Sequence, residues 1–596
     1  MTTAERRNAR VGSWLARLPR WVRVVIGVAG VILGAALIVR PTTSLGVLAL
    51  LIGVGMILTG VQELVGGEHE AAPRWRVLMA VLWIAAGVFV LLWLGLTVRV
   101  LALVVAAGLI VNGVFSLLSA FRRGQTPDAR VAAALLGVAS IAFGLLALLW
   151  PDITLLVVAV VFGARLVIAG LLEIWHALRG TRAKETTDAA PTALGRWTRT
   201  VAAVVAVVLA VVAGSTSATL RGGSPVVDEF YAAPREVPGG PGHLIRSEPF
   251  TRDVPANARG WRILYTTTNA DGAPAVASGI VVAPRDGAGA WPVIDWAHGT
   301  TGFAQQCGPS LLEKPFESGA LFLLPEIVDS GWALVASDYI GLGTPGPHPY
   351  LVGVPTAHAV LDARRAASQL ADADLGDRTV VWGHSQGGGA ALWTGALADD
   401  YAPDLALAGV AALAPASDLS GLVDTLPTIT GGSVFGSFVL AAYTGLYDDV
   451  TYRAYVHPGV EVTVREMAKR CLSEPSVLVS ILEDLGLSRD PEIFAMPATE
   501  GAFGERLTEN MPPPAVSAPL LLGQGASDPL ILPSVQDAFV ARLCDVGQQV
   551  DYRLYGGRDH LTLVHPDSPL VPELIEWTTA RFAREPVAPG CTRTEH

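Results

Sequence analysis

Long apolar runs dominate the first third of the chain, whereas short apolar runs alternate with polar ones in the remainder. The long runs lie near residues 22–39, 44–65, 77–94, 98–121, 131–149 and 153–175. At about 1.5 Å of rise per residue, each is long enough, or nearly so, to cross roughly 30 Å of hydrocarbon as a helix. We therefore predict a six-helix membrane domain over residues 22–180, preceded by an N-terminal segment 1–21.

These runs form an internal repeat of three helical hairpins. The segments VILGAALIVRP, WIAAGVFVLLW and SIAFGLLALLWP carry the central glycines Gly34, Gly87 and Gly144, spaced by 53 and then 57 residues. The second helix of each hairpin carries a further glycine with the same spacing, at positions 60, 113 and 170. Two markers with equal offsets indicate three copies of one unit, and small residues let helix backbones approach closely in lipid. The repeat resembles the HdeD-like family of six-helix membrane proteins, which is linked to acid resistance.

Basic residues are distributed unevenly over the predicted connections. Sixteen Lys and Arg residues lie at the start of the chain up to Arg23, in the even-numbered connections and in the basic stretch 179–199, which includes the linker 181–199, whereas the odd-numbered connections hold only Arg40 and Arg99. The positive-inside rule therefore places the N-terminus in the cytoplasm.

A seventh apolar run follows at 200–220 and carries the chain out of the cytoplasm again. Its end, VVAGSTSATL, also resembles the core and small-residue end of a signal peptide, with Thr216 and Ala218 near a possible cleavage point. The sequence leaves open whether this helix is a retained anchor or is cleaved.

Arg165 is a charge in the middle of a predicted span, where an ionisable residue is a functional candidate by default. The alternative is a structural charge paired across the bundle with Glu63 or Glu173. We favour the structural alternative because the same span offers no second polar residue that suggests a pathway.

The pattern of apolar and polar residues changes after a Gly- and Pro-rich linker at 221–242. Short β-rich runs alternate with helix-like ones over 243–596, which predicts an α/β domain with a mainly parallel sheet. Eight candidate strands begin near residues 261, 277, 292, 332, 378, 407, 519 and 550. Between the sixth and seventh strands lie about a hundred residues, 416–515, which are too many for a plain loop. We predict that these residues form a cap over the active site, whose candidate residues are described next.

Ser385 lies where the fifth of these strands meets a helix-prone run. Residues 383–387 read GHSQG and fit the pattern G-x-S-x-G, which occurs once in the chain. The glycines are needed because the turn is sharp and a side chain at either position would crowd its neighbours. We interpret Ser385 as a nucleophile rather than as a serine in a structural turn.

A serine nucleophile needs a base and an orienting acid. In proteins that carry the nucleophile on a G-x-S-x-G turn between a strand and a helix, the three residues follow along the chain in the order Ser, acid, His. Asp528 follows the seventh strand and His560 the eighth, so both should lie at the sheet edge that carries Ser385. We rank four rivals below them because their positions suggest structural roles: Asp559, Asp338, His298 and His384.

When a serine attacks a carbonyl carbon, the carbonyl oxygen becomes negatively charged in the tetrahedral intermediate. This oxyanion needs two preorganised hydrogen-bond donors. One should be the backbone N–H of Gln386, and the other should come from the loop HGTTGF after the third strand, at Thr301 or Gly302. The prediction includes no cofactor and no metal ion.

Charge and cysteine content separate the two halves further. Residues 1–223 hold 20 Lys and Arg against 9 Asp and Glu, whereas residues 224–596 hold 22 against 44. The acidic half would repel nucleic acid and anionic lipid surfaces. All four cysteines lie in that half, which favours two disulfides and an oxidising compartment over four buried thiols.

The segments HGTTGFAQQCGPS, ASDYIGLGTPGPHPY, VVWGHSQGGGAALW and YAPDLALAGVAALAPASDL, with the Asp528–His560 pair, resemble the secretory lipase family over about 225–590. The resemblance implies an α/β-hydrolase domain with a helical cap, carboxylic-ester hydrolysis, and a triad of Ser385, Asp528 and His560. It also implies the disulfides Cys307–Cys471 and Cys544–Cys591. The membrane part departs from the family, whose usual members are secreted and free.

The sequence therefore predicts a seven-helix membrane domain followed by an extracytoplasmic α/β-hydrolase that acts on lipid or other esters. Two alternatives stay open: acyl transfer to envelope alcohols, and an acid-stress membrane protein whose rear domain only binds an ester ligand. The natural substrate, the acyl chain length and the oligomeric state are left open.

Overall fold

The computed structural model describes residues 19–39, 74–92, 94–121, 126–179, 193–223, 225–287, 289–487 and 493–596, with the single residues 54, 57 and 61. The predicted second span at 44–65, Glu63 and most of the segments 1–21 and 181–199 lie outside the described residues. The chain divides into two compact units. The first comprises Met1–Gly222 with Val456–Thr463 and Leu485–Ile493, and the second comprises Gly223–Tyr455, Val464–Asp484 and Phe494–His596.

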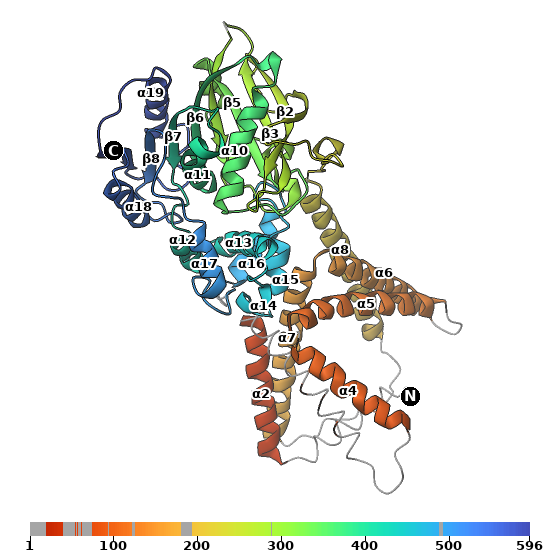
Figure 1. The fold of residues 1–596 in the computed structure, drawn as a ribbon. Coiled ribbons are helices and arrows are strands. Elements are labelled where there is room, and N and C mark those ends of the chain that lie inside the picture. Colours follow the sequence, from red (N-terminus) through yellow and green to blue (C-terminus); the bar gives the residue numbers. More distant parts are fainter. Residues whose placement is uncertain are drawn as a thin grey trace. The chain divides into compact units, whose positions relative to one another are not determined.

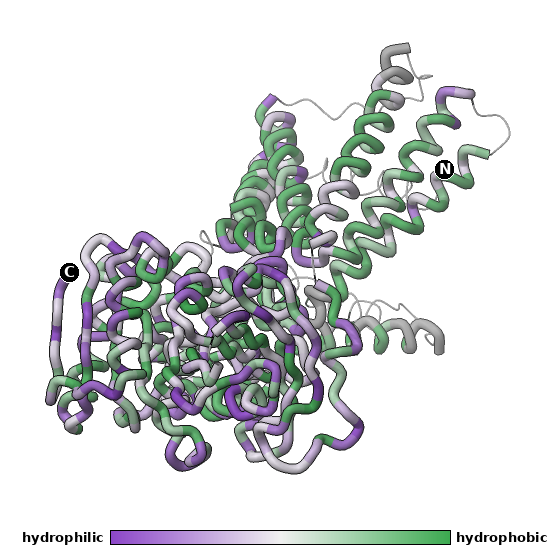
Figure 2. The backbone as a smooth tube through the Cα atoms, turned by 90° about the horizontal axis from the view of Figure 1, so that it is seen from above, coloured by the Kyte–Doolittle hydropathy of each residue, from purple (hydrophilic) through white to green (hydrophobic). Residues whose placement is uncertain are grey.

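The first unit is built from long apolar helices, which are hydrophobic along most of their length (Figure 2). They are α2 (Arg20–Val39), α4 (Arg74–Leu92), α5 (Leu94–Ala120), α6 (Pro127–Leu149), α7 (Pro151–Arg179) and α8 (Ala193–Arg221). Among the described residues, five helical segments are long and apolar enough to cross a membrane, and α8 contributes one of them, Thr200–Arg221. The helical character predicted for the N-terminal region is therefore confirmed.

Small residues hold these helices together in a pattern that follows the repeat. A Cβ placed on Gly34 of α2 would lie 2.5 Å from the carbonyl oxygen of Gly163 in α7, and one on Gly170 would lie 2.5 Å from that of Gly27. In the same way α5 meets α6, where a Cβ on Gly113 would lie 2.7 Å from the oxygen of Gly137. In the described residues, α5, the second helix of the second repeat, thus packs on α6, the first helix of the third repeat, and α7 packs on α2.

Polar contacts reinforce the helix packing. Arg23 on α2 forms an ion pair with Glu173 on α7 at 2.6 Å. Glu173, one of the two partners expected for Arg165, therefore pairs with Arg23, while the Arg165 side chain is exposed. At the other end of the bundle, Trp150 donates a hydrogen bond from Nε1 to Ser217 Oγ on α8 at 2.9 Å.

The second unit is organised around a sheet that has ten strands in the described residues (Figure 1). They are β1 (Leu244–Phe250), β2 (Ala258–Thr268), β3 (Pro274–Pro284), β4 (Trp291–Ala297), β5 (Ala333–Ile340), β6 (Leu375–His384), β7 (Leu407–Leu413), β8 (Leu520–Gly525), β9 (Val550–Tyr555) and β10 (Cys591–Glu595). Their order is β1-β2-β3-β5-β4-β6-β7-β8-β9-β10. The pairings from β1 to β5 are antiparallel, and all those from β5 through β10 are parallel.

Helices cover both faces of this sheet. They are α9 (Leu324–Asp329), α10 (Gly353–Ala367), α11 (Gln386–Tyr401), α18 (Pro533–Asp545) and α19 (Leu570–Phe582). Residues alternate between the faces: Ile294 and Trp296 of β4 join the apolar cluster of α9 and α19, whereas Val293 and Ala297 join that of α10. The α/β class that the sequence predicts is thereby confirmed.

A helical insertion separates β7 from β8, as predicted for the cap. It contains α12 (Leu419–Thr425), α13 (Gly432–Leu446), α14 (Tyr452–Tyr455), α15 (Glu461–Met467), α16 (Val477–Leu487) and α17 (Gly501–Glu509). Within the predicted linker 221–242, the short helix η1 (Glu229–Tyr231) buries Phe230 and Tyr231 against Leu264 and Leu311 of the second unit. Phe230 and Tyr231 therefore contribute to its core, with Val227 partly buried against them.

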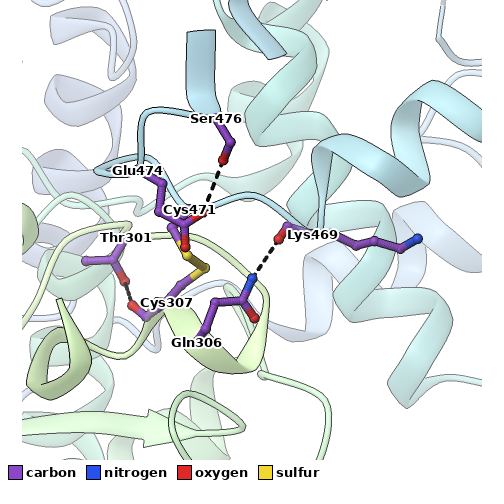
Figure 3. Close-up of a disulfide and its surroundings, with 7 residues drawn as sticks. All are labelled: Thr301, Gln306, Cys307, Lys469, Cys471, Glu474 and Ser476. Carbon is purple, nitrogen blue, oxygen red and sulfur yellow. Dashed lines mark hydrogen bonds between the residues drawn. A yellow bond between two sulfur atoms is a disulfide. The ribbon is translucent and has the colours of Figure 1, made fainter. Parts of the chain in front are cut away.

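Two disulfides join distant parts of the second unit, and they are the pairs that the family resemblance implies. Cys307–Cys471 links the loop after β4 to the cap segment before α16 (Figure 3). Cys544–Cys591 links α18 to the edge strand β10.

Candidate active site

Ser385 occupies a sharp turn between β6 and α11. Its backbone angles are φ 59° and ψ −119°, a conformation that residues other than glycine rarely adopt. The flanking glycines are required by contact: a Cβ on Gly383 would lie 2.0 Å from the oxygen of Gly387, and one on Gly387 would lie 1.9 Å from the oxygen of Ala297. The crowding that the sequence motif predicts is therefore present on both sides of Ser385.

Asp528 and His560 come together at the ends of β8 and β9. His560 Nδ1 lies 2.8 Å from Asp528 Oδ2, and the aspartate side chain is fully buried. The other oxygen, Oδ1, accepts hydrogen bonds from the backbone N–H groups of Leu530 and Ile531 at 2.9 and 2.8 Å. A carboxylate held in this way can only accept from Nδ1–H, so His560 Nε2 is left to accept a proton.

His384 connects this pair to the turn that carries Ser385. Its Nε2 lies 2.8 Å from the backbone carbonyl oxygen of His560, and the two imidazole rings are 4.7 Å apart. Because a carbonyl only accepts, Nε2 of His384 carries the proton. Burial lowers the pKa of His384 to about 3, which keeps the ring neutral.

The rivals considered from the sequence have other partners. The Asp559 carboxylate accepts from the backbone N–H groups of Leu561 and Thr562 and from the Thr562 hydroxyl, and these bonds hold its pKa below the usual value. Asp338 is buried and accepts from Ser278 and Ser310. His298 stacks on Tyr339 at 4.2 Å, and burial lowers its pKa to about 4.

A small cavity lies beside Ser385 under the cap. Its volume is about 20 Å³, enough for roughly one water molecule. The walls are mainly apolar and come from the sheet edge, from the cap and from the loop after Asp528, with Thr300, Tyr350, Ser385, Gln386, Leu422, Phe435, Val439 and Ile531 among the lining residues. Of these wall residues the sequence identified Ser385 and Gln386, and Leu422, Phe435 and Val439 lie within the predicted cap 416–515.

The loop after β4 contributes to this cavity through Thr300, whose hydroxyl lies 3.0 Å from that of Tyr350. Its neighbours are directed elsewhere: Thr301 Oγ1 donates to the Cys307 carbonyl at 2.8 Å (Figure 3). Gly302 adopts φ +145°, and a Cβ there would lie 2.6 Å from Cys307 Sγ. The disulfide therefore packs against the predicted oxyanion loop. Thr300 is a further candidate hydrogen-bond donor to the oxyanion, beside Thr301 and Gly302, and the sequence analysis missed it.

Gln386, whose backbone N–H is the other predicted donor, is held by a buried histidine. Its Nε2 lies 3.1 Å from Nε2 of His348, whose Nδ1 in turn lies 3.1 Å from the carbonyl of Ile340. Burial lowers the pKa of His348 to about 3, so the neutral ring accepts from Gln386 and donates to Ile340. No sequence motif marked His348 for this position.

A mixed sheet with helices on both faces, a nucleophile-type turn after one parallel strand, and a carboxylate and histidine after two later ones define an α/β-hydrolase. Comparison with known proteins agrees. The secretory lipase family model matches residues 318–590, and a short repeat of unknown function, DUF308, matches residues 25–90, 78–145 and 135–215. The C-terminal part of the chain therefore matches the secretory lipase family, and the N-terminal part matches three DUF308 repeats.

Individual relatives cover the same C-terminal region. A probable inactive lipase of Mycobacterium tuberculosis is 27% identical over 396 residues, which span 62% of this chain and 85% of that protein. Lipase 6 of Candida albicans is 24% identical over 413 residues, spanning 62% of this chain and 84% of that one. The crystal structure of Candida antarctica lipase A superposes with a TM-score of 0.53 at 19% identity, covering 63% of this chain and 90% of that one, which shows the fold.

The repeat matches also agree with the glycine spacing. They begin at residues 25, 78 and 135, so their starts differ by 53 and 57 residues, as do the marker glycines. The threefold repeat and its spacing are therefore confirmed.

Proposed function

We propose that this chain is a serine hydrolase of carboxylic esters, of the lipase and esterase type, held at the outer face of a membrane by its helical unit. The observation that carries the proposal is the 2.8 Å contact of His560 with the buried Asp528, next to the turn that presents Ser385. The family match to secretory lipases supports the reaction class. The apolar helices and the two disulfides support a membrane-bound domain in an oxidising compartment.

In this mechanism Ser385 Oγ attacks the ester carbonyl while His560 Nε2 takes its proton. Asp528 fixes the imidazole tautomer through Nδ1 and stabilises the imidazolium that forms. The backbone N–H of Gln386 and a donor from residues 300–302 stabilise the negative charge on the tetrahedral oxygen. His560 then protonates the leaving alcohol as the acyl-enzyme forms. In the second step His560 takes a proton from water, which attacks the acyl carbon. The bond from Ser385 Oγ to that carbon then breaks, His560 returns the proton to Ser385 Oγ, and the carboxylic acid is released.

The cap takes part in substrate entry. A cavity of about 20 Å³ has no room for an acyl chain, and Phe435 and Val439 of α13 form part of its wall. Displacement of α13 is therefore needed before an ester can reach Ser385, and the apolar surface thereby uncovered suits an acyl group.

A second candidate is a rear domain that binds an ester without hydrolysing it. The observation that favours it is that one relative, from Mycobacterium tuberculosis, is named as a probable inactive lipase. The two candidates differ in whether Ser385 forms a covalent acyl-enzyme.

The test is labelling of the full chain by a fluorophosphonate probe, together with hydrolysis of a short soluble ester. The wild type should be labelled and should turn over, and Ser385→Ala should lose both. Ser247→Ala, at an exposed position on β1, is the matched control and should retain both. A wild type that neither labels nor hydrolyses esters would rule out the hydrolase and leave the binding alternative.

A further inference from the structure

The cap helix α16 exposes its apolar face and buries its polar face, which is the reverse of the usual arrangement on a soluble domain. Its exposed side chains are Leu478, Ile481, Leu482 and Leu485, at 55, 39, 64 and 50% of full exposure. These positions follow the i, i+3, i+4, i+7 pattern of one helix face. Among the described residues of 225–596, eight large apolar side chains are exposed, and these four lie on one eleven-residue helix.

The polar face of α16 is turned inward and fixed there. Glu483 forms a buried ion pair with Arg470 at 3.0 Å, and Arg470 also donates to Ser480 at 3.2 Å. Asp484 accepts from the backbone N–H groups of Gly431 and Ser433 at the start of α13. Rolling the helix to bury its leucines would break this ion pair and expose or strand its charges, so the apolar face is fixed in its outward orientation.

We propose that this face, residues 478, 481, 482 and 485, docks onto the surface of the lipid bilayer in which the chain's own helices are inserted. The inference rests on the proposed membrane anchoring, but not on catalysis. It gives the cap a second attachment to the membrane, independent of α8.

The distribution of charge on α16 favours lipid as the occupant. Both charged residues of α16 face inward, so the outward face presents no charge to the headgroups, although the domain as a whole is acidic.

A second copy of the chain is a poorer fit. Four side chains that each expose about half of their surface offer a few hundred Å², against roughly 800 Å² per partner in a standard protein interface. A patch of that size does suit a helix that lies in the headgroup region with its apolar face buried about 5–10 Å.

The test places one thiol-reactive fluorescent probe at a time on the full chain in phosphatidylcholine vesicles that carry spin-labelled lipids. All four cysteines are in disulfides, so an introduced cysteine is labelled alone. Leu482→Cys reports on α16, Leu209→Cys on the middle of α8, and Asp271→Cys on the exposed turn between β2 and β3. We expect shallow spin labels to quench position 482 most and deep labels to quench position 209 most, with position 271 unquenched.

Each other outcome overturns the proposal in a distinct way. Quenching at 209 without quenching at 482 would leave the anchoring intact and rule out docking. No quenching at 209 would remove the anchoring and the docking together. A blue shift at 482 that disappears when the protein is diluted to one copy per vesicle, without lipid quenching, would show that a second copy covers the face.

A functional arm separates docking from the chemistry. The double variant Leu478→Asp, Leu482→Asp should hydrolyse a short soluble ester like the wild type but lose roughly tenfold or more on an ester carried in vesicles. Equal loss on both substrates would overturn the docking role. If the wild type hydrolyses neither substrate, the proposed function fails, and the probe measurements still decide the docking.

Discussion

Ser385 shows how a reactive position is held at the scale of one residue. Its unusual backbone angles are maintained by three backbone hydrogen bonds: its N–H donates to Leu413 at 2.9 Å, and its carbonyl accepts from Gly389 and Ala416 at 3.1 Å each. Such conformations cost energy and persist only where the surroundings determine them. The carboxylate of Asp528 is likewise fixed in position by hydrogen bonds, from two backbone N–H groups and from His560.

The two aspartates near His560 should therefore respond differently to substitution. Asp528→Asn should lower kcat on a soluble ester by about three to four orders of magnitude, because an amide at that position favours the wrong imidazole tautomer. Asp559→Asn should lower it less than about tenfold, because its carboxylate bonds to Leu561 and Thr562 rather than to the imidazole. Steady-state kinetics of both variants measure the two losses, and thermal unfolding checks that both variants are folded. A larger loss for Asp559→Asn than for Asp528→Asn would show that Asp559 is the acid that orients His560.

Asp295 should make stability depend on pH. It lies in β4 with a fully buried carboxyl, and neither oxygen has a hydrogen-bond partner among the described residues. Burial raises its pKa well above the usual value, and the positive charge of Arg364 offsets this only in part. The folded chain then holds a proton that the unfolded chain releases above about pH 4, so the free energy of unfolding falls as pH rises through the folded-state pKa.

The variant Asp295→Asn does not titrate and should lack this slope. Relative to wild type it should gain about 1.4 kcal/mol per pH unit between pH 4 and the folded-state pKa. Denaturant unfolding at pH 4, 6 and 8 measures the difference, with Asp372→Asn at an exposed carboxylate as the control. Parallel curves for wild type and Asp295→Asn would show that Asp295 is ionised in the folded chain.

At the scale of elements, glycine contacts between helices explain why the repeat recurs with fixed spacing. Gly34→Ala should destabilise the α2–α7 pair by about 1–3 kcal/mol, since the new Cβ would lie 2.5 Å from the Gly163 carbonyl oxygen. Gly108→Ala, where nothing lies within 4 Å, should be neutral or slightly stabilising because alanine favours helix. Thermal unfolding of both variants in detergent compares them, and equal melting temperatures would contradict the close packing.

The same elements show what the sequence could and could not predict. Spans, repeats and the strands that flank Ser385, Asp528 and His560 have strong patterns, and eight of the ten strands were anticipated. The strands β1 and β10 were missed because LIRSEPF and CTRTE lack a continuous apolar pattern, and every residue of β10 is exposed. Thr300, Tyr350 and His348 were missed because only the folded loops bring them to the cavity and Gln386.

At the scale of the whole molecule, the membrane part and the hydrolase differ in charge, in cysteine content and in fold, and α8 is the helix that precedes the hydrolase in the sequence. This helix runs continuously from Ala193 to Arg221. Two of its residues near the suspected cleavage point contact Trp150 at the end of α6: Ser217 accepts its Nε1–H at 2.9 Å, and Arg221 lies 4.8 Å above its ring. A signal peptidase would need this stretch extended and free.

We therefore predict that the helix is retained and that the hydrolase stays attached outside the cytoplasm. The uneven distribution of basic residues, the predicted odd number of spans and the confinement of all four cysteines to the rear domain agree on this placement without sharing an assumption. Protease added to intact cells should digest the rear domain, with a cytoplasmic protein as the control for lysis. The enzyme should remain in the membrane fraction at full length. A protected rear domain would reverse the topology, and a mature N-terminus near Thr219 would show that the esterase is released and works as a separate protein.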